Sequence, residues 1–133
     1  MPEDGAVTWI PNPYARGELV VVVDCADLER AARFWTAALG YVAEGSGGGR
    51  YQSLLPADGP GVEILLQRTT DPKHGKNRVH LDVNPTDRSQ DEEIARLIGL
   101  GATVLNDNRP EFSWVTLADP EGNEFDILAG RRP

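Results

Sequence analysis

The stretch Asn77-Arg78-Val79-His80-Leu81-Asp82-Val83-Asn84 alternates polar and apolar side chains near the middle of the chain. Such alternation is typical of a β-strand that has one face toward the core and the other toward solvent. His80, one of two histidines in the chain, lies inside this expected strand. The stretch also begins a second half whose pattern follows that of the first, so the fold and the site both depend on it.

The first half reads as a strand, a helix and three further strands, and the second half repeats this order. The β-branched run 18–25 predicts a buried strand, as does the stretch around His80. Landmarks recur at a spacing of about sixty residues, which indicates an internal duplication. Position 20 aligns with 80, Gly40 with Gly101, and 63–65 with 126–128. We therefore predict an α+β fold of two βαβββ modules in tandem, with cupped mixed sheets around a cleft.

Five segments follow from this pattern. We expect an N-terminal arm over 1–17, module one over about 18–69, a linker over about 70–77, module two over about 78–129 and a tail over 130–133. The arm contains prolines that disfavour a helix or a ladder. It also contains Trp9, Ile10 and Tyr14. These side chains are expected to pack on the domain, to form a lid, or to clasp a second subunit.

Both expected helices carry recognisable ends. Asp27 suits an N-cap for a helix over about 28–39, and Gly40 suits its C-terminal end. The second helix is capped by Thr86, Asp87 or Ser89 and closes at a glycine near residue 101. Trp35 lies on the apolar stripe of the first helix, which predicts a core position.

Composition narrows the class of partner. The formal net charge is 13 − 21 = −8, which argues against nucleic acid or an anionic membrane and leaves small molecules or proteins. A single cysteine, Cys25, excludes an internal disulfide framework and fits a reducing compartment. The N-terminus shows no signal-peptide pattern, and no apolar run reaches the roughly 18 residues of a membrane span. We expect a cytoplasmic protein.

Three segments resemble the vicinal oxygen chelate superfamily, which contains glyoxalases, bleomycin-resistance proteins and dioxygenases. They are 27–35 with Leu39-Gly40-Tyr41, then 78–83, and most specifically Asp119-Pro120-Glu121-Gly122-Asn123-Glu124-Phe125. The resemblance covers about residues 18–129 and is closest to small glyoxalase-like proteins of actinobacterial type. It implies two modules, each a cupped sheet, usually paired within a dimer, so we expect a homodimer.

The resemblance also implies where a metal would lie, on the first and last strands of the modules. The corresponding positions here are Val20, Glu63, His80 and Asp126. Glu63, His80 and Asp126 would offer one imidazole and two carboxylates, a set that suits Mn²⁺, Fe²⁺, Ni²⁺ or Zn²⁺. Glu63 is alternatively a catalytic base. Val20 departs from the family pattern, and Asp126 is shorter than the usual Glu.

Two hypotheses follow. The first is a small-molecule binding protein of this fold, for drug or metabolite sequestration, without an intact metal site and with no cofactor assigned. Its ligand would contact Val20, Tyr51, His80, Phe112 and Trp114, because a cupped sheet with an aromatic lining suits a flat or apolar molecule. The alternative is a glyoxalase-type lyase or isomerase, or a dioxygenase, that uses a divalent metal at Glu63, His80 and Asp126. His74 is expected to be exposed and without a role.

Overall fold

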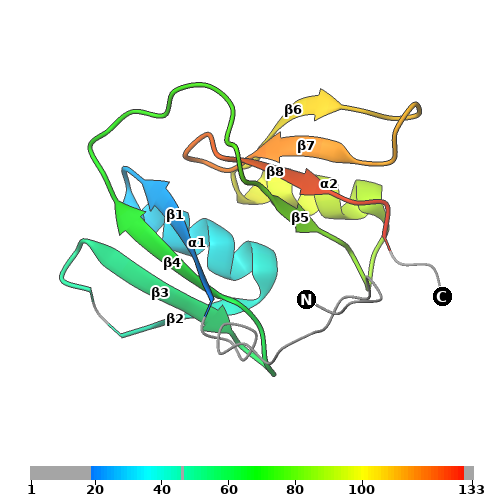
Figure 1. Ribbon diagram of the computed structural model, residues 1–133. Helices are drawn as coiled ribbons and strands as arrows, with labels where there is room; N and C mark the ends of the chain where they lie inside the picture. The colour runs from blue at the N-terminus through cyan, green and yellow to red at the C-terminus, as the bar shows by residue number, and fades with distance from the viewer. Residues whose placement is uncertain (1–18, 46, 131–133) are drawn as a thin grey trace, which may run out of the picture.

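The computed structural model describes residues 19–45 and 47–130, so the predicted N-terminal arm and most of the tail lie outside the described residues. The chain forms two modules of one helix and one four-stranded sheet each (Figure 1). This confirms the α+β class and the tandem repeat. Module one consists of β1 (Val20–Cys25), α1 (Leu28–Leu39), β2 (Tyr41–Glu44), β3 (Tyr51–Pro56) and β4 (Glu63–Arg68). Module two consists of β5 (Leu81–Val83), α2 (Gln90–Leu100), β6 (Thr103–Asp107), β7 (Val115–Ala118) and β8 (Glu124–Ile127).

The two sheets share one topology. Their strand orders are β1-β4-β3-β2 and β5-β8-β7-β6, with the first and last strands of each module parallel and the other pairs antiparallel. Val20 lies opposite Glu63 in module one, and Asp82 lies opposite Asp126 in module two. Counted from the helix-ending glycines Gly40 and Gly101, Ser53 corresponds to Thr116. These two residues lie opposite Leu65 and Asp126, so Leu65 is the counterpart of Asp126 and Val22 is the counterpart of Asp82. The predicted alignment of Val20 with His80 therefore holds, whereas the alignment of 63–65 with 126–128 was two residues out of register, because backbone pairing, not residue similarity, sets the register.

The helix ends agree with the sequence. The Asp27 side chain accepts a hydrogen bond from the Arg30 N–H, and Gly40 ends α1 in the left-handed region at φ 69°. Ser89, one of three predicted caps, begins α2 with a reciprocal capping box to Glu92. Because these bonds satisfy N–H groups that lack helical partners, they define where each helix begins.

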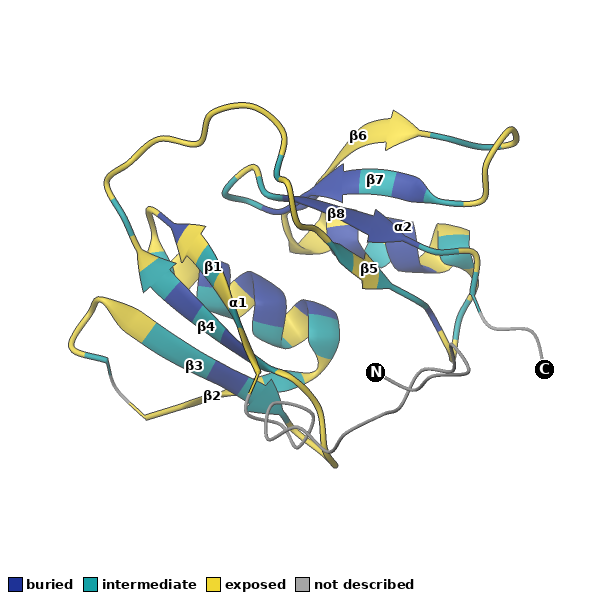
Figure 2. Cartoon of the chain, in the orientation of Figure 1, coloured by how far each residue is buried: buried dark blue, intermediate teal, exposed yellow. Residues whose placement is uncertain are grey.

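A shared core joins the modules. Trp35 of α1 is 2% exposed and packs edge-on against Phe34 and Phe125, with ring centroids 5.0 Å from each. The predicted core position of Trp35 is confirmed. Figure 2 shows buried residues along β8 and on the helix surfaces, whereas β6 is exposed along its length. Among the described residues, no helix is long and apolar enough to cross a membrane.

Two strands are shorter than the sequence suggested. The stretch around His80 forms only the three residues of β5, and His80 lies directly before it, not inside it. The predicted strand over 112–118 begins at Val115, so Phe112 and Trp114 precede β7. In both places a polar–apolar alternation extends beyond the residues that pair with a neighbouring strand.

Candidate functional site

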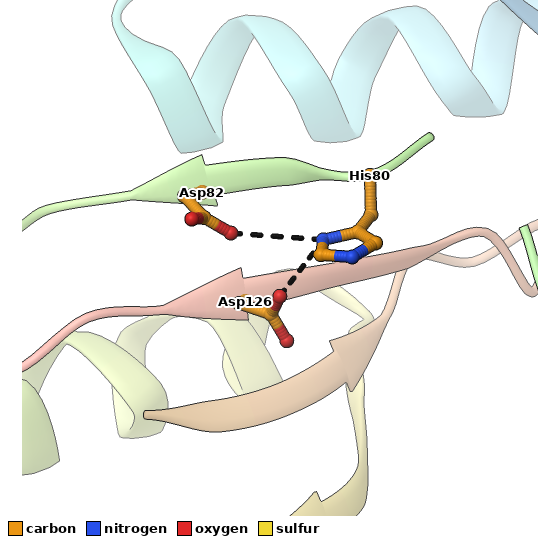
Figure 3. Close-up of side chains that lie close together, drawn as sticks. All are labelled: His80, Asp82 and Asp126. Atoms are coloured by element: carbon orange, nitrogen blue, oxygen red, sulfur yellow. Dashed lines mark ion pairs between the residues drawn. The ribbon is translucent and has the colours of Figure 1, made fainter. Parts of the chain in front are cut away.

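Three side chains of module two converge on one point, and Figure 3 shows them facing one another from β5, its preceding residue and β8. His80 Nδ1 lies 2.9 Å from Asp126 Oδ2 and 3.6 Å from Asp82 Oδ1. One potential ligand atom from each of the three residues lies within 4.8 Å of the others. We refer to His80, Asp82 and Asp126 as the His80 group.

The strand geometry explains this convergence. His80 and Asp82 are two residues apart, so their side chains point to the same face. Asp126 lies opposite Asp82 in the parallel ladder, which brings its side chain to that face as well. Thr116 of β7 donates its hydroxyl to Asp126 Oδ1 at 2.6 Å, while Asp126 Oδ2 faces His80. Contacts to both oxygens therefore orient the Asp126 carboxylate.

The His80 group concentrates negative charge. The pKa of Asp82 is raised, first by burial and then by the hydrogen bond and charge of Asp126, with His80 opposing the shift. The side chain of Asp126 is 9% exposed, whereas those of His80 and Asp82 are 37% and 52% exposed. A buried carboxylate with an accessible imidazole and a second carboxylate above it is suited to holding a cation.

A cavity of about 860 Å³ opens over the His80 group. Its volume is in the usual range for a small-molecule site. Module two and the linker form its walls, with apolar, amide and charged side chains together. The lining residues are Lys73, Gly75, Lys76, His80, Asp82, Leu105, Asn106, Asn108, Trp114, Thr116, Gly122, Glu124, Asp126 and Leu128.

Glu124 attaches the linker to this cavity. Its carboxylate, with a side chain 8% exposed, pairs with Lys73 Nζ at 2.7 Å and accepts a hydrogen bond from the Asn77 N–H at 2.7 Å. Burial alone would raise the pKa of Glu124, but the bonds from Lys73 and Asn77 outweigh it and lower the pKa. The connection between the modules is therefore a fixed wall of the cavity and not a loose tether.

The predicted site residues separate into two sets. His80, Trp114 and Asp126 line the cavity. Val20, Glu63, Tyr51 and Phe112 do not. Phe112 is half exposed and contacts Trp114 from outside the lining, with ring centroids 5.0 Å apart.

Glu63 lies apart from the His80 group. Its carboxylate accepts a hydrogen bond from the Ser53 hydroxyl of β3 at 2.7 Å, and it is absent from the metal-compatible group that the described residues form. Asp82 takes the third place in that group. Sequence reasoning missed Asp82, although its position two residues after His80, on the same strand face, was a signal for it.

The most specific motif of the sequence has a structural role in the described chain. Asp119 is 4% exposed, and its Oδ1 accepts hydrogen bonds from the N–H groups of Glu121 and Asn123 at 2.9 and 2.8 Å. Its Oδ2 accepts the indole N–H of Trp35 at 2.9 Å. The turn of module two is thereby attached to the core helix of module one.

Glu121 strengthens this attachment at the start of α1. Its carboxylate accepts the N–H groups of Ala26 and Asp27 at 2.6 and 3.2 Å and pairs with Arg30. Burial would raise the pKa of Glu121, but these bonds more than offset it and lower the pKa. A carboxylate at a helix N-terminus is also favoured by the helix dipole. We call Asp119–Asn123 the inter-module latch.

The fold and the cupped module-two site define a member of the vicinal oxygen chelate superfamily. More specifically, the chain belongs to the family of the glyoxalase-like domain, whose model matches residues 20–128. A comparison with curated proteins finds no match.

Solved structures with the same fold include fosfomycin resistance proteins. The fosfomycin resistance protein FosX from Mesorhizobium loti has a TM-score of 0.68 at 16% identity, over 86% of this chain and 92% of that one. A variant of FosX from Listeria monocytogenes, in complex with Mn(II) and 1S,2S-dihydroxypropylphosphonic acid, has a TM-score of 0.67 at 18% identity, over 84% and 87%. A "possible Glyoxalase" from Bacillus cereus gives 0.61 at 18%, over 83% and 96%. At these identities the likeness establishes the fold alone.

The His80 group fits a divalent metal by its donor chemistry. One imidazole and two carboxylates form a set that first-row divalent cations accept. Metal–ligand bonds of about 2.0–2.2 Å place neighbouring donors roughly 3–4 Å apart, which agrees with donors gathered within 4.8 Å. Of the predicted set, His80 and Asp126 belong to this group, its third member is Asp82, and Glu63 is not part of it in the described chain.

Proposed function

We propose that the module-two cavity binds a small molecule, whose polar end meets the His80 group and whose apolar part lies against Trp114. The observation that carries this proposal is the cavity of about 860 Å³, which combines apolar side chains with a charged cluster at one place. Such a combination is the usual character of a ligand site: apolar contacts supply affinity, and a few polar groups set orientation.

Charge favours a cationic group at the polar end. Asp82 and Asp126 contribute two carboxylates beside one imidazole, and the whole chain carries a net charge of −8. A cation between the two carboxylates would relieve their mutual repulsion, which the raised pKa of Asp82 reflects after burial. An aromatic face such as that of Trp114 also attracts cations.

A second candidate function is supported by the donor set itself. His80, Asp82 and Asp126 would hold a divalent metal, and such a metal supplies Lewis-acid activation of a substrate oxygen. In this reading the protein is a glyoxalase-type lyase or isomerase, or a dioxygenase. Asp126 would be oriented by Thr116, and Trp114 would bound the space for substrate. The Mn(II) complex of the Listeria FosX variant makes manganese the first metal to test.

One pair of titrations tests both candidates. Mn²⁺ is added to metal-free protein and measured by calorimetry, and tryptamine is added separately and followed by amide chemical shifts at residues 80, 82, 114 and 126. Indole-3-acetate, which has the same ring and the opposite charge, is the control ligand. His80→Ala and Asp126→Asn remove the His80 group, and Glu63→Gln is the matched control in module one.

The outcomes separate the candidates. Tryptamine binding that exceeds indole-3-acetate binding and weakens at least about tenfold in Asp126→Asn supports the cation-binding cavity. Mn²⁺ binding that weakens about a hundredfold in His80→Ala and is unchanged in Glu63→Gln supports the metal site. Tryptamine-induced chemical-shift changes outside the cavity residues would contradict the cation-binding cavity. Equal Mn²⁺ affinity in all variants would contradict the metal site.

We also propose a cytoplasmic location and a homodimer. A cytoplasmic location is supported by the single cysteine, Cys25, which is buried and whose thiol pKa is raised to about 11, first by burial and then by nearby carboxylates. A homodimer is supported by family resemblance, and light scattering of the purified protein would test it.

A further inference from the structure

Two arginines stand opposite each other at one end of the module-one sheet. In the antiparallel ladder of β3 and β4, Tyr51 lies opposite Gln67, so the next pair outward is Arg50 and Arg68. The Arg68 N–H donates to the Arg50 carbonyl at 2.8 Å, which continues the pairing. Residues opposite each other in a ladder direct their side chains to the same face, and like charges in that arrangement are destabilising.

No acidic partner offsets this pair within the described chain. Within residues 19–45 and 47–130, no carboxylate oxygen lies within salt-bridge distance of the guanidinium group of Arg50 or of Arg68. Asp27 and Glu29, which line a depression together with Arg68, have other partners: Asp27 caps the helix, and Glu29 pairs with Arg33. In a chain with a net charge of −8, two adjacent cations without acidic partners are unexpected.

The arginines border a surface hollow of about 450 Å³ with donors suited to an oxyanion. Its lining includes Gly48 and Gly49, which have φ values of 66° and 81°, and also Thr69 and Thr70. Backbone N–H groups of a turn in this conformation can approach an anion closely, because no side chain intervenes. No carboxylate lines the hollow; its residues are Gly48, Gly49, Arg50, Gln67, Arg68, Thr69 and Thr70.

The hollow continues toward the N-terminus of α1. A neighbouring depression of about 610 Å³ shares Gly49 and Arg68 with it and reaches Leu28. Asp27 and Glu29 also line that depression, and the Glu121 carboxylate occupies the N-terminus of α1, so the helix dipole does not add to the field of the two guanidinium groups. Neither depression shares a lining residue with the module-two cavity.

We propose that Arg50 and Arg68, with the Gly48–Gly49 turn, form an anion site for a phosphate group of a small molecule. Guanidinium groups bind phosphate with paired hydrogen bonds, and a doubly charged oxyanion between them turns their repulsion into attraction. This site lies in module one and is separate from the proposed function of module two.

Inorganic phosphate and pyrophosphate are the probes, added to the full chain at ionic strength held constant with sodium chloride. Amide chemical shifts locate the binding, and thermal unfolding reports its effect on stability. The variants are Arg50→Gln, Arg68→Gln and the double variant. Arg78→Gln removes the same charge from an exposed position elsewhere and is the control.

The expected shifts are confined to residues 48–50 and 67–70, and the affinity falls about tenfold in each single variant. Pyrophosphate raises the unfolding temperature of the original chain and of Arg78→Gln, and this rise is lost in the double variant. Without phosphate, the double variant unfolds at a temperature equal to or above that of the original chain, because the like-charge pair is gone. Shifts elsewhere, an unchanged affinity in the double variant, or an equal response to chloride alone would each overturn the site.

Discussion

The two modules share a topology and differ in what that topology presents at equivalent positions. In module one the parallel pair of first and last strands places Val20 opposite Glu63, and the Glu63 carboxylate accepts a hydrogen bond from Ser53. In module two the parallel pair of first and last strands places Asp82 opposite Asp126, where module one has Val22 opposite Leu65, and His80 lies beside them.

A second difference concerns the turns before the last strands. Module two has the inter-module latch, whose Asp119 and Glu121 reach α1. Module one has the exposed turn 57–62 at the corresponding place. Duplication therefore preserved the ladder in both halves, while the His80 group and the carboxylates of the latch occur in module two. Three changes test this asymmetry.

The largest expected effect is on the latch. Asp119→Ala would leave the Trp35 indole N–H and the N–H groups of Glu121 and Asn123 without their acceptor. A buried donor left without an acceptor costs about 1–3 kcal/mol. With three such donors, we expect the free energy of unfolding to fall by about 3 kcal/mol. Urea denaturation measures it. Asp58→Ala, in the exposed turn of module one, should change it by less than about 0.5 kcal/mol. Similar losses in the two variants would show that the turns are equivalent after all.

The linker wall should respond less strongly. Glu124→Gln removes the charge that pairs with Lys73 and retains an acceptor for the Asn77 N–H. We expect a loss of about 1 kcal/mol and hydrogen exchange several-fold faster over residues 73–77. Because the pKa of Glu124 is lowered by folding, its stabilisation is present at neutral pH and disappears as the pH falls through the folded pKa.

The matched change in module one is Glu63→Gln, whose carboxylate accepts a hydrogen bond from the Ser53 hydroxyl of β3. The rate of amide hydrogen exchange over residues 73–77 should not change in Glu63→Gln. If Glu124→Gln leaves the exchange of the linker unaltered, the linker is held by other contacts and the wall does not depend on Glu124.

The smallest expected effect has the opposite sign. Folding raises the pKa of Asp82 above its ordinary value of 3.8, so the folded state is penalised once Asp82 ionises. That penalty sets in as the pH rises through the unfolded pKa and is complete above the folded pKa. Asp82→Asn should therefore raise the unfolding temperature by about 2 °C at pH 7, and the gain should vanish below pH 3.8.

Asp107 provides a control of reversed sign. Its pKa is lowered to about 2 by hydrogen bonds from Arg109, so its ionised form stabilises the fold above the unfolded pKa of 3.8. Asp107→Asn should lower the unfolding temperature at pH 7, and the loss should shrink as the pH falls toward 2. An Asp82→Asn variant that is destabilised at pH 7 would contradict the view of the His80 group as a centre of unbalanced negative charge.

Local features of the fold were accessible from sequence because they depend on neighbouring residues. The Asp27 cap, the Gly40 end and the apolar stripe that buries Trp35 each follow from residues within a few positions of one another. The repeat was also visible, since it needs only the order of elements and their spacing. His80, Asp126 and Trp114 were identified through their places in that repeat and through the family resemblance.

The remainder of the site depends on register and on contacts between distant segments. A shift of two residues in the alignment of the last strands gave Asp126 the wrong counterpart, Glu63 in place of Leu65, and Asp82 was not noticed. The separation of Glu63 from the His80 group, and the linker wall at Glu124, are set by how the sheets and the linker lie relative to one another. Periodicity in one chain carries no information about such distances.

The inter-module latch has a consequence for how related chains are compared. Asp119-Pro120-Glu121-Gly122-Asn123 is the segment by which this chain is most readily recognised, yet its side chains fasten one half to the other. Chains that are grouped because they share this segment would be grouped by how their two modules are attached. Their reactions would have to be sorted by a different criterion: the residue types at positions equivalent to 80, 82 and 126.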